Sequence, residues 1–146
     1  MDRTLRMLSP DDLYEVLVLE NLCYVNNHWT LEQFKSCLCE ENCYGLICVE
    51  NEDVVGFAIY LLLDFHLAIL NFAVHPNKRR QGVGSQMFYR LVKIGEAYNL
   101  QEVVLEVRET NIRMQKFLQS QNCLAKHVLN GHYPDGETAY QFVRKL

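Results

Sequence analysis

Hydrophobic and polar residues follow two spacings along the chain, one typical of strands and one typical of helices. Apolar extended runs cover 44–50, 54–63 and 67–74, and the turn-like segments 51–53 and 64–66 separate them. Short segments of this kind join strands that are neighbours in a sheet. The middle of the chain is therefore predicted to form a meander of antiparallel strands.

Helical spacing marks other segments. Residues 9–12 combine a capping hydroxyl, a proline at the first helical position and two acidic side chains, and residues 30–33 fit a capping box. The helix that follows the glycines is predicted to end near Tyr98, and Asn111 can cap the last helix. The apolar positions of these helices are Leu13, Val16 and Leu17; Leu31, Phe34 and Leu38; Met87, Phe88, Leu91 and Val92; and Met114, Phe117 and Leu118.

Further strands are predicted at 4–8, 102–108, 124–129 and 138–144. In the strand at 102–108, the valine and leucine side chains at odd positions share one face, and Glu106 lies on the other. No internal repeat and no low-complexity linker interrupts this order of elements.

Composition limits the classes of function. A chain of 146 residues with 49% apolar side chains can bury one core, so we expect a single α/β domain, residues 1–146. A net charge of −4 argues against direct nucleic-acid binding, despite the basic run at 78–80. The longest apolar run, 54–63, is too short to span a bilayer, and residues 1–3 open no signal peptide. We expect no membrane association and a cytoplasmic location.

The cysteines and histidines do not predict a metal site. The closest group, Cys37, Cys39 and Cys43, lacks the Cys-x-x-Cys spacing of a zinc knuckle, and no second ligand pair follows it. The histidines show no His-x-x-x-His spacing either. We therefore expect reduced thiols and no bound metal.

The segment 71–85 is the most informative part of the chain. It runs from an apolar strand through a basic turn to Gly82 and Gly84 and then into a helix. Glycines let the main chain approach a ligand, and the unpaired N–H groups of a first helical turn bind anions, which together favour a pyrophosphate. A P-loop would need lysine where Ser85 stands, and a dinucleotide fingerprint would need a third glycine where Met87 stands.

A family resemblance narrows the ligand. Residues 79–84 read Arg-Arg-Gln-Gly-Val-Gly and resemble the Gln/Arg-x-x-Gly-x-Gly/Ala signature of the GNAT superfamily of N-acetyltransferases. Other motifs, in order along the chain, are most similar to bacterial enzymes that acetylate the N-terminal alanine of a ribosomal protein. They are His28-Trp29-Thr30, Ala73-Val74-x-Pro76, Leu105-Glu106-Val107-Arg108 with Asn111, and Tyr133-Pro134-Asp135-Gly136. The resemblance implies the GNAT fold, a mixed, mostly antiparallel sheet of about seven strands flanked by about four helices.

The resemblance also implies acetyl-CoA as the cofactor and assigns the residues that bind it. The backbone of residues 72–74 would pair with the pantetheine arm, the basic turn and the amides up to residue 85 would hold the pyrophosphate, and Asn111 would lie near the thioester. The implied cofactor-binding residues are Phe72, Ala73, Val74, Arg79, Arg80, Gln81, Gly82, Val83, Gly84, Ser85 and Asn111. The alternative for the basic run at 78–80 is a solvated turn.

Acetyl transfer to an amine needs a proton acceptor and a proton for the leaving thiolate. The matching glutamate of the resembled family accepts the proton, which points to Glu106; the alternative is an ion pair with Arg108 on the same face of the strand. The family's usual proton-donating tyrosine aligns with Leu118, which has no proton to give. Tyr133 or water could replace it, the alternative for Tyr133 being a packing role.

The acceptor is expected to be the N-terminal α-amino group of a protein or peptide, such as a ribosomal protein. An α-amino group has a pKa of about 7.7–8.0, against about 10.4 for lysine, so a modest base can deprotonate it. Possible walls of the acceptor groove are Tyr24, Trp29, His132 and Tyr133. A small-molecule amine acetyltransferase and a non-catalytic acyl-CoA-binding module remain alternatives. The oligomeric state is expected to be a monomer or a weak homodimer.

Overall fold

The computed structural model describes residues 2–146 and contains one seven-stranded sheet with the strand order β1-β2-β3-β4-β5-β7-β6. All neighbouring strands are antiparallel except β4 and β5, which are parallel. The strands are β1 (Arg3–Met7), β2 (Cys43–Glu50), β3 (Asp53–Leu62), β4 (His66–Val74), β5 (Glu102–Arg108), β6 (Leu124–Leu129) and β7 (Ala139–Lys145). The predicted meander and the mixed, mostly antiparallel sheet are confirmed.

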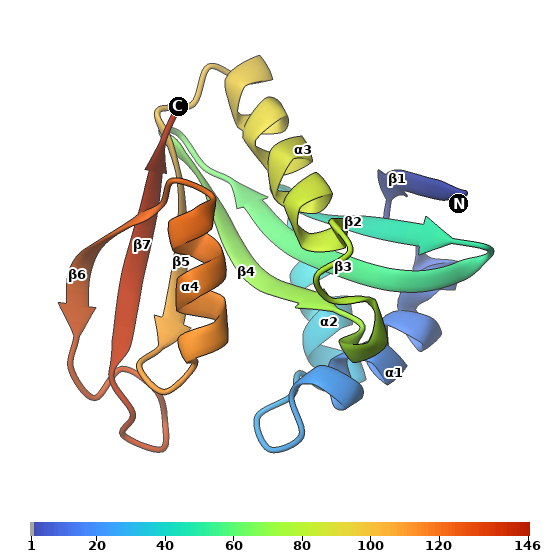
Figure 1. Cartoon of the computed structure of the whole chain (residues 1–146), viewed down its shortest axis with the longest axis horizontal. Helices are drawn as coiled ribbons and strands as arrows, with labels where there is room; N and C mark the ends of the chain where they lie inside the picture. Colours follow the sequence, from blue (N-terminus) through green and yellow to red (C-terminus); the bar gives the residue numbers. More distant parts are fainter. Residues whose placement is uncertain (1) are drawn as a thin grey trace.

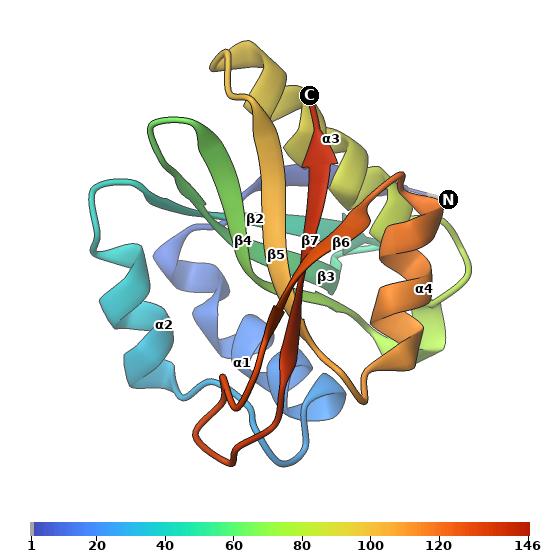
Figure 2. The same cartoon turned by 90° about the vertical axis from the view of Figure 1, so that its left-hand side faces the viewer.

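The helices cover both faces of this sheet, with α1 and α2 on one side and α3 and α4 on the other (Figure 2). They are α1 (Leu13–Cys23), α2 (Leu31–Leu38), α3 (Val83–Ala97) and α4 (Ile112–Ser120), with short 3-10 turns at Pro10–Asp12 and Pro76–Lys78. Each pair buries its own apolar cluster against the sheet, around Phe34 and Phe57 on one face and around Met87 and Phe88 on the other. No helix of residues 2–146 is long and apolar enough to cross a membrane.

The predicted helix starts are confirmed in two cases. Thr30 Oγ1 accepts from the backbone N–H of Gln33, and Gln33 Oε1 accepts from the N–H of Thr30, which is a complete capping box. Asn111 Oδ1 accepts from the N–H of Met114 and caps α4. The first helix differs slightly from the prediction, because residues 10–12 form a 3-10 turn before α1 begins.

The sheet opens between its two parallel strands. β4 and β5 are paired only as far as Ile69 and Leu105, and beyond that point they diverge (Figure 1). The register of β4 against β3 shifts by one residue at Leu70, which is the position of a β-bulge. A bulge bends its strand and increases the local twist. The separation leaves the C-terminal halves of β4 and β5 facing an opening rather than each other.

A partly buried ion pair stabilises the start of α1. The Arg6 guanidinium binds both carboxylate oxygens of Asp12 at 2.9 Å, and the N–H of Ser9 donates to the same carboxylate at 2.7 Å. These bonds hold the pKa of Asp12 at about 2. Since that value is below the value of about 3.9 for an unfolded aspartate, ionised Asp12 adds stability above about pH 4 and loses this effect as the pH falls towards 2.

We therefore expect Asp12→Asn to lower the free energy of unfolding at pH 7 by about 1–2 kcal/mol, because the ion pair and a charged hydrogen bond are lost. Urea unfolding at a series of pH values would show the difference from the wild type disappearing between about pH 4 and pH 2. Asp11→Asn, at the exposed neighbouring position, is the matched control and should be nearly neutral at every pH. A constant difference across the acid range would contradict this account.

Candidate active site

The opening between β4 and β5 contains two connected grooves. The first has a volume of about 1170 Å³ and lies between β4, the turn before α3 and helix α4. Its lining residues are Cys23, Tyr24, Phe72, Ala73, Val74, Pro76, Arg79, Arg80, Gly82, Gly84, Ser85, Asn111, Ile112, Arg113, Met114, Lys116, Phe117 and Ser120. We call this the cofactor groove. Most of the residues predicted to bind the cofactor line it, but the side chains of Gln81 and Val83 do not.

The N-terminus of α3 gives the cofactor groove an anion-binding end. Gly82 precedes the helix with φ +85°, a left-handed conformation that favours glycine. The first helical bond of the turn runs from the N–H of Gln86 to the carbonyl of Gly82, so the N–H groups of residues 83–85 have no partner within the helix. Because the residue before the helix is a glycine, no N-cap side chain accepts a hydrogen bond from these N–H groups. Unpaired amides at the positive end of a 15-residue helix are suited to phosphate oxygens.

Gly84 has a different role from Gly82. A Cβ atom at Gly84 would lie 3.2 Å from the ring of Phe117 and 3.6 Å from Val74. The missing side chain therefore lets the first turn of α3 pack closely against α4. Phe117 in turn stacks near Phe72, with ring centroids 5.6 Å apart. This packing forms the apolar middle of the cofactor groove.

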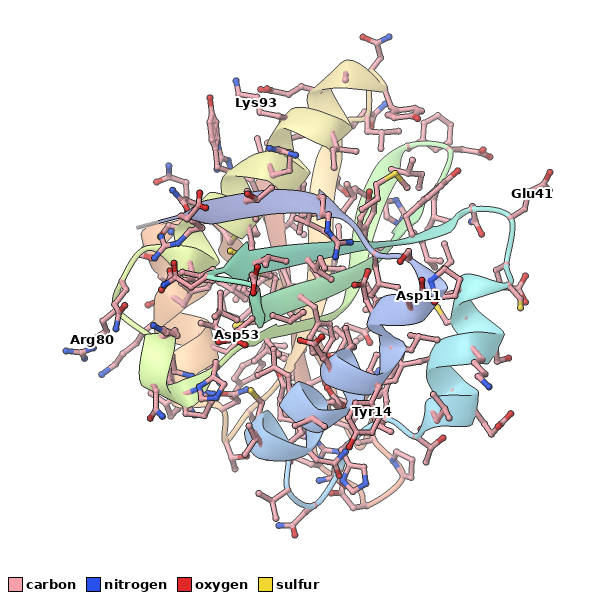
Figure 3. The ribbon with its side chains drawn as sticks, turned by 90° about the vertical axis from the view of Figure 1, so that its right-hand side faces the viewer. Asp11, Tyr14, Glu41, Asp53, Arg80 and Lys93 are labelled. Atoms are coloured by element: carbon pink, nitrogen blue, oxygen red, sulfur yellow. The ribbon has the colours of Figure 1, made fainter. Side chains whose placement is uncertain are left out.

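Basic side chains line the cofactor groove, although the chain as a whole is acidic. Arg79 and Arg80 come from the turn before α3, and Arg113 and Lys116 come from α4. Figure 3 shows Arg80 extending from this turn, away from the body of the protein. Lys78, by contrast, forms an ion pair with Glu50 at 3.0 Å.

Glu50 forms a second ion pair, with Arg3, and Arg3 also contacts the turn before α3. Arg3 Nη2 binds Glu50 at 2.8 Å, and Arg3 Nη1 donates to the carbonyl of Gln81 at 3.1 Å. The cationic partners hold the pKa of Glu50 below its ordinary value, with Lys78 the largest contributor. Arg3 thus connects β1 directly to the residue that precedes Gly82.

The second groove has a volume of about 670 Å³ and lies on the other side of the opening. Its lining residues are Glu20, Tyr24, Val25, Asn26, Asn27, His28, Trp29, Gln33, Ile69, Leu70, Asn71, Phe72, Leu105, Glu106, Val107, Arg108, Asn111, Met114, Tyr133 and Pro134. We call this the acceptor groove. Tyr24, Phe72, Asn111 and Met114 line both grooves and mark the point where they meet.

The main chain of β4 presents polar groups to this meeting point. The N–H of His75 pairs with Val55 of β3, and because main-chain groups alternate between strand edges, those of Ala73 also face β3. Those of Phe72 and Val74 face the opening. Accordingly, the Tyr24 hydroxyl donates to the Phe72 carbonyl at 2.6 Å, and Arg79 Nε donates to the Val74 carbonyl at 3.2 Å.

The sequence predicted only that Tyr24 forms a wall of the acceptor groove. In the structure Tyr24 has a second role. Its hydroxyl is fixed on the Phe72 carbonyl, and burial raises the pKa of the phenol well above its ordinary value. A phenol that stays protonated and is committed to a backbone carbonyl holds the edge of β4 in place. The N–H groups on that edge are left facing the groove.

Glu106 lines the acceptor groove from β5. Its Oε1 atom lies 2.8 Å from His132 Nε2, and its side chain is 42% exposed, which leaves it in contact with water. The alternative partner, Arg108, is engaged elsewhere and binds Asp135 at 2.9 Å and Glu137 at 2.7 Å. The structure thus brings Glu106 and His132 together, and no Lys or Arg of residues 2–146 forms an ion pair with Glu106.

Tyr133 lies beside this pair. The Arg108 guanidinium stacks over its ring at 4.0 Å, and the rings of His132 and Tyr133 are 5.1 Å apart. Burial raises the pKa of the Tyr133 hydroxyl, and the nearby charge of Glu106 acts in the same direction. The hydroxyl therefore keeps its proton at neutral pH. Leu118, at the position of the usual tyrosine, is fully buried in the core and lines neither groove.

Two buried polar residues are among the groove residues that the sequence did not predict. Glu20 and Asn71 both line the acceptor groove, and both are more than nine-tenths buried. One signal could have found Glu20, because it stands four residues after Val16 on the buried face of α1. A carboxylate on the apolar face of a helix needs hydrogen-bond partners. Asn71 gave no such signal, since it follows β-strand spacing like its neighbours.

Comparisons with known proteins agree with this geometry. A family model described as the acetyltransferase (GNAT) family matches residues 11–122. An N-alpha-acetyltransferase of Saccharolobus solfataricus is 26% identical over 99% of this chain and 94% of that protein. The structure of Ard1 from Thermoplasma volcanium is similar with a TM-score of 0.90 at 26% identity, covering 100% of this chain and 99% of that one. The ribosomal-protein-S18-alanine N-acetyltransferase of Escherichia coli shares the fold, with a TM-score of 0.89 at 24% identity over 99% of this chain and 94% of that one.

Proposed function

Because the chain belongs to the GNAT family of acetyltransferases, we propose that it transfers an acetyl group from acetyl-CoA to the N-terminal α-amino group of a protein or peptide. The observation that carries the proposal is the junction of the two grooves at Tyr24, Phe72, Asn111 and Met114. An acyl donor in one groove and an amine in the other would meet there. Glu106, in the acceptor groove, supplies a carboxylate on the amine's side.

The cofactor groove fits coenzyme A in its charge and shape. Its basic end, with the unpaired amides of residues 83–85, suits a pyrophosphate. Its apolar middle, around Phe72 and Phe117, suits the pantetheine arm. The edge of β4 would bind that arm through the N–H groups of Phe72 and Val74 rather than through Ala73, whose main chain faces β3. When bound, acetyl-CoA supplies an acetyl group activated as a thioester.

Residues in and beside the acceptor groove provide for proton transfer. Glu106 accepts the proton of the amine, directly or through a water molecule that its exposure allows. His132 fixes the orientation of the carboxylate. Tyr133 retains its proton at neutral pH and can donate it to a departing thiolate, a role for which Leu118 has neither the proton nor the position.

The choice of a protein N-terminus as acceptor rests on two supports. One relative, which is similar over 99% of this chain, is named N-alpha-acetyltransferase. The acceptor groove is also an open channel between the loop at 24–29, the edges of β4 and β5 and the turn at 133–134, which suits an extended peptide better than a compact amine. The low pKa of an α-amino group relative to lysine matches a partly exposed carboxylate base.

We expect the purified protein to acetylate the N-terminus of short peptides with acetyl-CoA, and to acetylate small amines at least about 100-fold less efficiently in kcat/KM, because a small amine cannot use the rest of the groove. A mass-spectrometric assay with a panel of N-terminal peptides beside a panel of polyamines and aminoglycosides measures this. A preference for the small amines would show that the acceptor is a small-molecule amine and not a protein N-terminus. Tight acetyl-CoA binding without turnover on either panel would instead indicate a non-catalytic acyl-CoA-binding module.

A further inference from the structure

Glu20 is a carboxylate buried beneath the acceptor groove. It is 1% exposed, and its two oxygens accept from different parts of the chain, Oε2 from the N–H of Trp29 at 2.7 Å and Oε1 from Asn71 Nδ2 at 2.9 Å. No Lys, Arg or His of residues 2–146 forms an ion pair with it. Burial raises its pKa, and the two N–H donors, which bind the charged form, oppose that rise. The carboxylate thus joins α1, the loop at 24–30 and β4.

This bond orients the amide of Asn71. Glu20 Oε1 accepts the hydrogen bond from Asn71 Nδ2, so the amide turns its NH₂ group towards Glu20 and its Oδ1 atom away. Among the hydrogen bonds of residues 2–146, the one to Glu20 is the only one that the Asn71 side chain makes. No buried side-chain oxygen or nitrogen of the described residues lacks a partner, so Oδ1 is not sealed in the core. Asn71 is 8% exposed and lines the acceptor groove, so a ligand in this groove can reach Oδ1.

We propose that Asn71 Oδ1 binds the acceptor's α-amino group by accepting a hydrogen bond from one of its N–H groups. Glu20 is the positioning residue that orients this oxygen. The inference rests on the proposed function, because it deepens the description of the same acceptor groove. A fixed acceptor favours a ligand that brings a donor, and an amine is a donor whether or not it is protonated. Asn71 also follows the bulge at Leu70, beside the junction of the two grooves.

Glu20→Gln tests the orientation without removing the side chain. The N–H of Trp29 still requires an acceptor, so the new amide keeps its oxygen there and turns its NH₂ group to Asn71. The Asn71 amide then flips and presents NH₂ to the groove, where it opposes the donor of the substrate. We expect KM for a peptide acceptor to rise about tenfold, the value of one hydrogen bond, with KM for acetyl-CoA unchanged.

A merely structural role for Glu20 predicts the opposite result. The flipped Asn71 amide restores the hydrogen bonds of residue 20 to Trp29 and to Asn71, so KM for the peptide stays at its wild-type value. Trp29 is the single tryptophan of the chain, so its fluorescence reports whether the loop keeps its place. Unchanged emission together with an unchanged peptide KM would overturn the proposal.

A second experiment does not depend on turnover. Trp29 fluorescence would measure the binding of a peptide that begins with alanine and of its des-amino analogue, which carries hydrogen in place of the amino group. We expect the wild type to prefer the alanine peptide about tenfold and Asn71→Ala to bind both alike. The proposal fails if the wild type shows no preference or if Asn71→Ala keeps it. A preference lost in the variant, without acetylation of any peptide, would uphold this site and reject the proposed transferase activity.

Discussion

Replacement of Glu106 by glutamine is expected to lower kcat for peptide acetylation by about 10²–10⁴, the range that a general base contributes. Glutamine has nearly the same shape and can still contact His132, but it cannot accept the proton of the amine. The cofactor groove is formed by other residues, so the affinity for acetyl-CoA should not change. Steady-state kinetics, with calorimetric titration of acetyl-CoA, separates the two effects.

Glu102→Gln is the matched control. Glu102 lies on the same strand and, four residues away, on the same face, but it lines neither groove. Its replacement should leave kcat and the melting temperature almost unchanged. If Glu106→Gln turned over peptides at the wild-type rate, the proton would have to leave by another route, and the assignment of Glu106 as the base would be wrong.

Reversal of the charge at Arg80 is expected to raise KM for acetyl-CoA about 10- to 100-fold, with a smaller effect on kcat. A glutamate at this exposed position in the turn before α3 would repel the phosphates that the amides of residues 83–85 are suited to bind. Arg80 already has a left-handed φ of 62°, and exchange of one non-glycine residue for another adds little backbone strain. The loss should be largest at low ionic strength, because salt screens exposed charges.

Arg90→Glu makes the same charge change on the exposed surface of α3, outside both grooves. Acetyl-CoA titration at about 20 mM and 500 mM salt compares the two variants over a wide range of screening lengths. Equal effects of both variants would mean that net charge, rather than a local phosphate site, governs cofactor binding.

Most of the secondary structure could be predicted from the sequence because its causes are local. The capping box at 30–33, the cap at Asn111 and the alternation of β5 each depend on residues within a few positions of one another. The glycine turn could be identified for the same reason, although the sequence could not show that Gly84 serves packing against Phe117 as well as access for a ligand. Strand ends differ from the prediction by about one residue, which is the usual uncertainty in the boundaries of secondary-structure elements.

The sequence by itself determined the order of elements, the family resemblance and the face of β5 on which Glu106 lies. Only the tertiary structure decided how the site is assembled, because its contacts join residues far apart in the chain. Glu20 meets Asn71 across 51 positions, and His132 meets Glu106 across 26. Local periodicity carries no information about such pairs, since they depend on how the sheet opens beyond Ile69 and which loops reach the opening. The buried carboxylate, the orientation of the Asn71 amide and the junction of the two grooves are therefore properties of the folded chain.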